Sequence, residues 1–168
     1  VCGQILAGKG DIAVKLWGRN AERLAEIAAA RENRRYLPGV RLSERLGFEA
    51  DDPVALAGAG LVLCAIPTQF IRGMLTRLAP HVPAGARVVS VSKGIEVETL
   101  SRPTEIITSV LGRRPVAALS GPNIAAEMAR GLPATMVAAA SPEHQGLAEQ
   151  LQDLFTTPAL RVYTNEDL

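Results

Sequence analysis

The sequence is poor in cysteine and has no long hydrophobic run, and each shortage excludes a class of protein. Two cysteines in 168 residues, with no Cys-x-x-Cys and no histidine cluster beside them, argue against a disulfide-stapled secreted domain or a cysteine-based metal site. The longest mostly apolar stretch, Val54 to Pro67, is shorter than the roughly 20 residues that a membrane-spanning helix needs. No signal peptide is visible at the start. We therefore expect a cytoplasmic protein with reduced cysteines and no membrane association, in which Cys64 is a small buried hydrophobe.

An excess of charge of one sign is also lacking. The formal net charge is +1, and no run of like charge reaches five residues. The basic pairs Arg34-Arg35 and Arg113-Arg114 are too small for a nucleic-acid footprint. With 21% charged and 48% hydrophobic residues, the composition is that of a globular domain that does not bind nucleic acid.

Apolar runs typical of buried strands alternate with segments of helical periodicity. We expect strands over 12–17, 61–66, 87–91, 116–119, 135–139 and 160–163, and helices over 21–31, 51–57, 68–78, 104–111, 123–129 and 142–155. This alternation predicts an α/β fold, a Rossmann-like, doubly wound and mostly parallel sheet covered on both faces. No linker divides the chain, so we expect a single domain over residues 1–168.

The glycine-rich turn that normally opens such a sheet is missing. Gly8-Lys9-Gly10 and Gly58-Ala59-Gly60 each precede a strand rather than a helix, so we interpret both as plain turns. Residues 1–7 are better interpreted as the back half of a helix that Gly8 ends. On this interpretation the first strand and the glycine turn lie upstream of residue 1, and the sheet lacks its central strand. Two unpaired strand edges then face each other, which is an aggregation risk.

Small and polar residues follow two of the predicted strands. Ser92-Lys93-Gly94 comes after the strand that ends at Val91, and Ser120-Gly121-Pro122-Asn123 comes after the strand that ends at Leu119. Ligands bind outside the carboxyl ends of the strands in open α/β sheets. Lys93 is therefore expected to meet an anion or a carbonyl, with Gly121 and Asn123 closing on it.

Seven motifs in order resemble the N-terminal domain of bacterial NAD(P)-dependent glycerol-3-phosphate dehydrogenase. They cover nearly the whole chain: Trp17-Gly18-Arg19-Asn20, the segment 33–38, Ala65-Ile66-Pro67-Thr68-Gln69, the segment 91–96, the segment 119–125, Gly131-Leu132-Pro133 and the segment 161–165. The resemblance implies an oxidoreductase that interconverts sn-glycerol 3-phosphate and dihydroxyacetone phosphate with NAD or NADP and feeds glycerophospholipid synthesis.

The resemblance also implies roles for particular residues. Lys93 contacts both substrate and cofactor, and Gly121 and Asn123 line the substrate site, although the bacterial family often has Ser at the position of Asn123. Cofactor contacts fall on Arg19 and Tyr36 near the adenosine end, on Pro67 at the groove edge and on Ala125. Arg19 and Asn20 stand where a site selective for an unphosphorylated ribose often has a carboxylate, so NADP(H) should be tolerated.

The family continues into a helical second domain in which a lysine acts as general acid/base. No residue of this chain can be assigned that role, so we expect little activity from the 168 residues alone and a homodimer only for the full-length enzyme. Two alternatives stay open: a non-catalytic Rossmann-like binding module, and a related dehydrogenase for another small substrate. Single residues also have plainer interpretations: Asn123 as a helix N-cap, Arg19 as an exposed charge and Tyr36 as loop packing.

Overall fold

The computed structural model describes residues 1–168, and it has the α/β architecture that the sequence predicts. The strands are β1 (Val14–Trp17), β2 (Leu46–Glu49), β3 (Leu61–Cys64), β4 (Arg87–Ser90), β5 (Val116–Ser120), β6 (Ala134–Ala140) and β7 (Leu160–Asn165). The α-helices are α1 (Cys2–Gly8), α2 (Ala21–Ala30), α3 (Asp52–Leu56), α4 (Thr68–Leu78), α5 (Pro103–Leu111), α6 (Ala125–Ala129) and α7 (Gln145–Phe155). No helix is both long and apolar enough to cross a bilayer.

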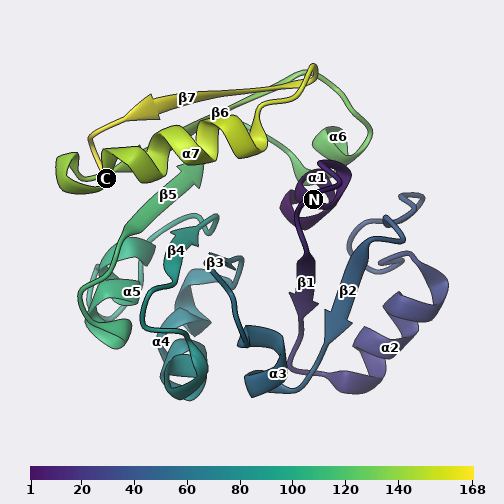
Figure 1. The fold of residues 1–168 in the computed structure, drawn as a ribbon, viewed down its shortest axis with the longest axis horizontal. Helices are drawn as coiled ribbons and strands as arrows, with labels where there is room; N and C mark the ends of the chain where they lie inside the picture. Colours follow the sequence, from purple (N-terminus) through teal and green to yellow (C-terminus); the bar gives the residue numbers. More distant parts are fainter.

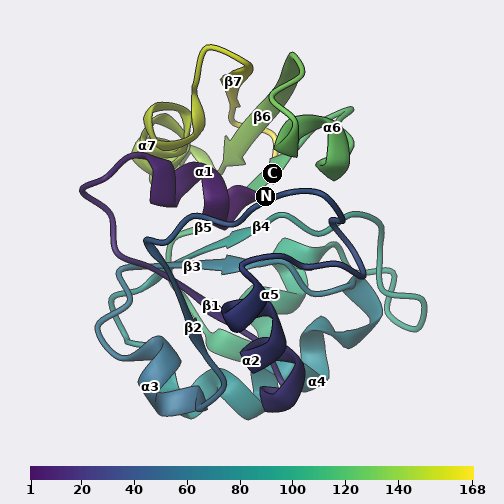
Figure 2. The same cartoon turned by 90° about the vertical axis from the view of Figure 1, so that its right-hand side faces the viewer.

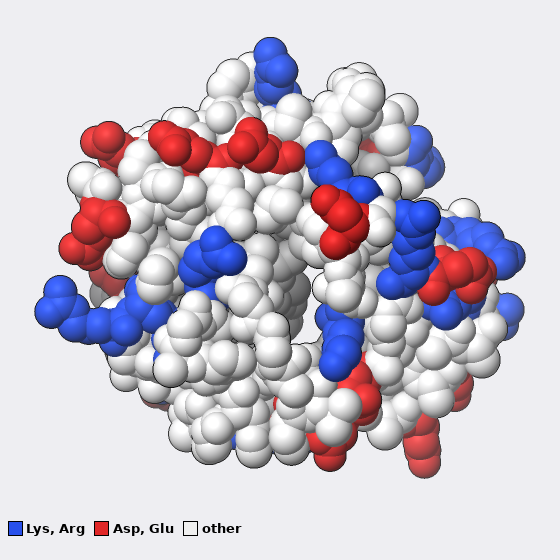
Figure 3. Space-filling view, in the orientation of Figure 1, with Lys and Arg blue, Asp and Glu red and all other residues white.

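The strands form two separate sheets (Figure 1). β1 and β2 make a parallel pair, with Val14 opposite Leu46 and Trp17 opposite Glu49. The other five strands follow in the order β3-β4-β5-β6-β7. Every neighbouring pair is parallel except β5 and β6, which are antiparallel. Each of β1 and β3 therefore keeps one unpaired edge, as expected for a sheet without its central strand, and the face in Figure 3 is hollowed between the two halves.

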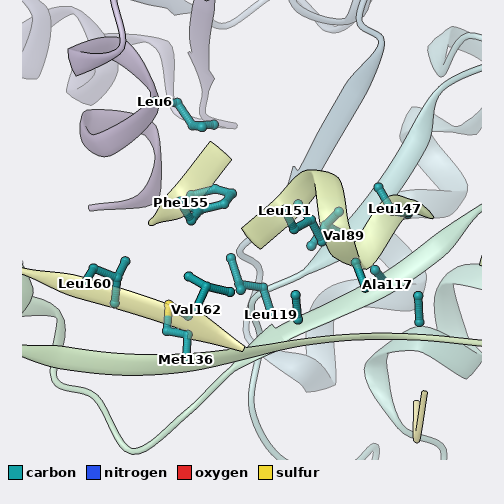
Figure 4. Close-up of a cluster of buried hydrophobic side chains, with 13 residues drawn as sticks. Leu6, Val89, Ala117, Leu119, Met136, Leu147, Leu151, Phe155, Leu160 and Val162 are labelled. Atoms are coloured by element: carbon teal, nitrogen blue, oxygen red, sulfur yellow. The ribbon is translucent and has the colours of Figure 1, made fainter. Parts of the chain in front are cut away.

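Helices cover both faces of the larger sheet. In Figure 2, α1 and α7 lie on one side of β3, β4 and β5, and α4 and α5 lie on the other. The first face holds a core of 13 buried residues built on Leu119, Leu151, Phe155 and Val162, with Leu6 of α1 packed into it (Figure 4). The second face holds 12 buried residues, with Ile71 and Leu75 of α4 against Ile106 and Ile107 of α5.

Side chains at the end of β1 join the two-stranded sheet to the larger half. The Trp17 indole Nε1 donates to Asp52 Oδ1 at 3.0 Å, and Arg77 of α4 donates to both oxygens of the same carboxylate. The Arg77 guanidinium also lies 5.9 Å from the centre of the indole ring. Asp52 thus connects β1 with α4, and its side chain is only 11% exposed.

Several predicted elements have different bounds, and one strand was not predicted. The expected strand 12–17 begins at Val14, and 61–66 ends at Cys64, because Pro67 already stands at the N-cap of α4. The expected helix 123–129 begins at Ala125, and 142–155 opens with a 3-10 turn over Pro142–His144. The apolar spacing along 68–78 places Phe70 on one face with Ile71, Leu75 and Leu78, but Phe70 is 61% exposed whereas the other three are buried. The unpredicted strand is β2, whose four residues include Gly47 and Glu49, residue types that are depleted in strands.

The predicted turns are confirmed, and an aspartate caps α3. Gly8 ends α1, the side chain of Asp51 caps α3 by accepting from the Val54 N–H at 3.0 Å, and both Gly-x-Gly segments lie in turns. Cys64 is buried, and this burial raises the pKa of its thiol. A thiol held protonated in this way is a packing residue rather than a nucleophile.

Candidate functional site

Lys93, Gly121 and Asn123 come together at the carboxyl ends of β4 and β5. The Lys93 ammonium donates to the Gly121 carbonyl oxygen at 2.6 Å, and the Asn123 backbone N–H donates to the same oxygen at 2.9 Å. Two loops that leave neighbouring parallel strands are therefore joined at one acceptor. The sequence predicted this meeting, because the carboxyl ends of neighbouring parallel strands lie at the same edge of a sheet.

Gly121 cannot carry a side chain at this place. A Cβ built there lies 2.5 Å from the carbonyl oxygen of Thr135 and 3.0 Å from the Cα of Met136, both in β6. Contacts this short to backbone atoms cannot be relieved by a rotamer change. The glycine therefore lets the turn after β5 approach the backbone of β6 closely, and this packing requirement is separate from any contact with a ligand.

Two donors at this junction have bonding capacity left. The exposed Lys93 ammonium has three N–H groups, and one of them is used on Gly121. The Asn123 Nδ2 is buried and has no hydrogen-bond partner. Buried amide nitrogens normally have partners, so this one marks Asn123 as a candidate for a ligand contact. Asn123 does not cap α6, because Ile124 stands at the N-cap and no side chain bonds that end.

Hydrogen bonds from the strand ends fix the loop that carries Lys93. The Ser92 hydroxyl donates to the Ile66 carbonyl at 2.6 Å, and the Thr68 hydroxyl donates to the Lys93 carbonyl at 2.7 Å. Gly94 follows with φ +90°, a left-handed conformation that favours glycine. The backbone thus turns sharply just after Lys93 and leaves its side chain free to reach Gly121.

Arg19 and Tyr36 lie in the region that follows β1. Asn20 caps α2 by accepting from the Arg23 N–H at 2.8 Å, so Arg19 lies one residue before the N-cap and is exposed. The Arg23 guanidinium lies 4.7 Å from the centre of the Tyr36 ring. Arg35 lies over the same ring at 5.3 Å. Tyr36 therefore stacks on arginines beside the first turn of α2, although its side chain is 66% exposed.

The remaining predicted residues lie at helix starts on the carboxyl edge. Pro67 is the N-cap residue of α4, and Ala125 is the first residue of α6; both are exposed. A hollow of about 540 Å³ also lies next to Pro122, lined by the start of β6 and the turn between α7 and β7. Lys93 does not line this hollow, so we place the candidate site at the Lys93–Gly121 junction instead.

Sequence reasoning gave no role to three polar side chains that contact the Lys93 loop or the Tyr36 ring. They are Gln69 and Arg72 on α4, and Arg23 on α2. Arg23 carries a buried NH2 nitrogen without a partner, which marks it as a further candidate for a ligand contact. For Gln69 and Arg72, the only indication in the sequence is their spacing. They are three residues apart and therefore share one face of α4, where both can contact the same loop.

The arrangement can hold an oxygen-rich ligand. A cation and an amide donor at the carboxyl edge suit a carbonyl or phosphate oxygen, and the arginines beyond β1 suit a second anionic group. No three His, Cys, Asp or Glu side chains gather as a possible metal site.

Comparison with known proteins adds the family. A family model described as the N-terminus of NAD-dependent glycerol-3-phosphate dehydrogenase matches residues 2–146. A glycerol-3-phosphate dehydrogenase (NAD(P)+) of Citrifermentans bemidjiense is 42% identical over 167 residues, which are 98% of this chain and 49% of that protein. One from Moorella thermoacetica is 43% identical over 164 residues, 98% of this chain and 48% of that protein. The chain thus spans about half the length of these relatives.

Solved structures agree with the sequence relatives. The glycerol-3-phosphate dehydrogenase of Coxiella burnetii matches with a TM-score of 0.91 at 29% identity, over 99% of this chain and 50% of that one. The yeast enzyme GPD1 matches with a TM-score of 0.85 at 26% identity, over 99% of this chain and 53% of that one. The chain therefore belongs to the NAD-dependent glycerol-3-phosphate dehydrogenase family, in which it corresponds to the N-terminal domain.

Proposed function

We propose that this chain is the nucleotide-binding half of an enzyme that interconverts sn-glycerol 3-phosphate and dihydroxyacetone phosphate. The observation that supports this most directly is the convergence of the Lys93 ammonium and the unpartnered Asn123 amide at the carboxyl edge of the sheet. Relatives at 42–43% identity are named for the dehydrogenase activity. The cofactor of the family is NAD or NADP.

The donors at the junction suit a substrate that carries both a carbonyl and a phosphate. The nicotinamide ring of the cofactor donates or accepts the hydride when it is bound. Lys93 then holds the substrate oxygen and stabilises the negative charge that develops on it, and Asn123 orients the substrate through its free N–H. We assign the proton transfer to a lysine outside these 168 residues, as the resemblance implies.

The arginines beyond β1 suit the adenosine end of the cofactor. Arg19 stands where a carboxylate would select an unphosphorylated ribose, and the Arg23 NH2 nitrogen nearby has no partner. Guanidinium groups bind phosphate in a bidentate way, so this end accepts the 2′-phosphate of NADP(H). Tyr36 supports Arg23 by stacking, and Pro67 and Ala125 border the groove from α4 and α6.

We also propose that the full-length protein is a cytoplasmic homodimer that binds neither nucleic acid nor membrane. The two free cysteines support the cytoplasmic location, and the net charge of +1 and the mixed charges on the face in Figure 3 support the absence of nucleic-acid and membrane binding, whereas the dimer rests on the family resemblance alone. Light scattering of the full-length protein at micromolar concentration tests the dimer, for which we expect the mass of two chains.

The test is reduction of dihydroxyacetone phosphate by the complete polypeptide that contains this chain. We expect Lys93→Met to lower kcat/KM by about 10²-fold or more, because it removes a donor to the reacting oxygen. Arg19→Glu should weaken binding of NADPH, measured by its fluorescence, and leave binding of NADH nearly unchanged. His81→Gln serves as the control, since His81 lies in a 3-10 turn after α4 and outside the site.

Each alternative has its own outcome. NADPH binding without turnover of any small carbonyl compound would favour a binding module. Turnover of another 2-oxo substrate, with dihydroxyacetone phosphate inert, would favour a related dehydrogenase. Unchanged kcat/KM in Lys93→Met would contradict the proposed role of Lys93.

A further inference from the structure

The first turn of α4 is bonded to the backbone of the Lys93 loop at three points. The Thr68 hydroxyl donates to the Lys93 carbonyl at 2.7 Å. The Gln69 amide donates to the Ile95 carbonyl at 2.7 Å and accepts from the Val97 N–H at 3.0 Å. Gln69 therefore pairs with the loop through both ends of its amide, much as a neighbouring strand would.

A bidentate ion pair completes this contact one turn later along α4. Arg72 Nε lies 3.1 Å from Glu96 Oε1, and Arg72 NH2 lies 2.6 Å from Glu96 Oε2. The Glu96 side chain is only 10% exposed and also accepts from the Thr99 hydroxyl. The third guanidinium nitrogen of Arg72 donates to the Ser109 hydroxyl of α5 at 2.9 Å. Arg72 thus connects the loop to two helices.

Before Lys93 the loop is held by Val91 and Ser92, which donate to the Cys64 and Ile66 carbonyls, and beyond Lys93 its contacts outside the loop come from α4. Residues 91–101 belong to no helix or strand. Their own backbone bonds close a small turn, in which the Glu96 N–H donates to the Ser101 carbonyl and the Leu100 N–H donates to the Glu96 carbonyl. Glu96 is therefore the anchor of this turn and lies three residues after Lys93. Movement at Glu96 would pass through Gly94 and Ile95 to the Lys93 backbone.

We propose that Arg72 and Glu96 are positioning residues that act through the loop backbone to hold the Lys93 ammonium on the Gly121 carbonyl. The inference rests on the proposed function only for the identity of the ligand that Lys93 then meets. A displacement of about 1 Å at a reacting group can cost about 10²-fold in rate. The Arg72–Glu96 ion pair can therefore affect turnover without contacting the substrate.

The chain contains a matched control for this ion pair. Arg77, five positions further along α4, makes a similar two-pronged contact with Asp52, at 2.6 Å and 2.9 Å. The Asp52 side chain is 11% exposed, close to the value for Glu96. Loss of either carboxylate charge leaves a similar unpaired guanidinium, but only Glu96 lies in the Lys93 loop. A loss of activity caused only by lower fold stability should therefore be equal in Glu96→Gln and Asp52→Asn.

The lysine content allows the ammonium to be observed directly. These 168 residues contain three lysines, Lys9, Lys15 and Lys93, so labelling lysine with ¹³C at Cε and ¹⁵N at Nζ gives few resonances from this half, and the signal that is lost in Lys93→Arg assigns the Lys93 resonance in the complete polypeptide. We expect the order parameter of the Lys93 side chain to fall to that of a free surface lysine in Glu96→Gln and Arg72→Met. Arg72→Lys should restore part of it, because it keeps the charge without the planar fork. Asp52→Asn should leave it unchanged.

Turnover and folding are measured on the same variants. We expect kcat/KM for dihydroxyacetone phosphate in the complete polypeptide to fall about tenfold in Glu96→Gln and to stay within twofold in Asp52→Asn. If Glu96→Gln fails to fold, Gln69→Ala is used instead, because it removes two loop bonds and leaves no buried charge. An unchanged Lys93 order parameter in whichever variants fold would overturn the proposal. If Lys93 becomes mobile in Glu96→Gln and Arg72→Met but the parent enzyme does not turn over dihydroxyacetone phosphate, the positioning role is supported and the proposed function is contradicted.

Discussion

At the scale of single residues, the sequence correctly predicted that Lys93, Gly121 and Asn123 lie together, and the structure changed the reason for one of them. Lys93, Gly121 and Asn123 meet as expected, because each follows a strand that ends at the same edge. Gly121 was singled out for substrate contact, yet the Cβ that it lacks would collide with the Thr135 carbonyl. Its identity is thus explained by packing, whatever ligand binds nearby.

Gly121→Ala should therefore destabilise the fold even without ligand. The methyl group must push β5 away from β6, and overpacking of this kind typically costs about 1–3 kcal/mol. The measurement is urea unfolding of the ligand-free protein. Gly146→Ala is the control, because Gly146 lies in α7 with nothing within 4 Å of its Cβ position, and a helical alanine should raise stability by roughly 0.5–1 kcal/mol. Equal stability of Gly121→Ala and the parent protein would contradict the packing account.

Arg72 and Glu96 could not be paired from the sequence. Glu96 follows Lys93 in a quoted motif and Arg72 lies on an amphipathic helix, but 24 positions separate them. Which arginine meets which carboxylate depends on how α4 packs beside β4 and the loop after it. The spacing of charges along the chain predicts ion pairs only within one helix, so it cannot predict ion pairs between different elements.

At the scale of elements, strong periodicity was a reliable guide and short irregular segments were not. α4 and α7 end where predicted, since both present apolar stripes that bury Ile71, Leu75, Leu151 and Phe155. β2 was missed because it contains Gly47 and Glu49 and gains its pairing only from β1. Its formation is a tertiary effect that local propensity opposes.

Helix α5 has an acid-sensitive N-terminus. The Glu105 carboxylate accepts from the Arg102 backbone N–H at 2.7 Å and from the Arg102 guanidinium at 3.0 Å. These two contacts, the guanidinium first, lower the pKa of Glu105. A carboxyl whose pKa is lower in the folded state adds stability above its unfolded pKa, and this contribution is lost as the pH falls through the folded value.

Glu105→Gln should therefore lower the melting temperature at pH 7 and have a smaller effect as the pH falls toward 3, because protonation of the parent carboxyl removes the same charge. Melting curves between pH 7 and pH 3 measure the difference. Glu149→Gln, an exposed substitution in the middle of α7 that removes no ion pair, is the control. A constant gap between Glu105→Gln and the parent protein across this range would argue against the assignment.

At the scale of the whole molecule, the sheet is divided. β4 and β5 have partners on both edges, whereas β1 and β3 each have one. The sequence predicted this division from the missing glycine turn. It did not predict how the halves stay together, which depends on Leu6 of α1 in the larger core and on Asp52 between Trp17 and Arg77.

Hydrogen exchange of the 168-residue chain should reveal the division. Peptides covering β1 and β3 should exchange faster than peptides covering β4 and β5, because amides on an unpaired edge open without disrupting the core. Mass spectrometry after timed labelling gives the rates. Equal protection of all four strands would mean that the two edges are covered in solution.

The Trp17–Asp52–Arg77 junction has an optical consequence. Trp17 is the only tryptophan of the chain, so its fluorescence comes from this one place, where a carboxylate and a guanidinium both lie against the indole. Any swing of β1 away from α4 removes both groups from the ring and admits water. The emission spectrum of the unlabelled protein therefore reports separation of its two halves even while the core of each half stays folded.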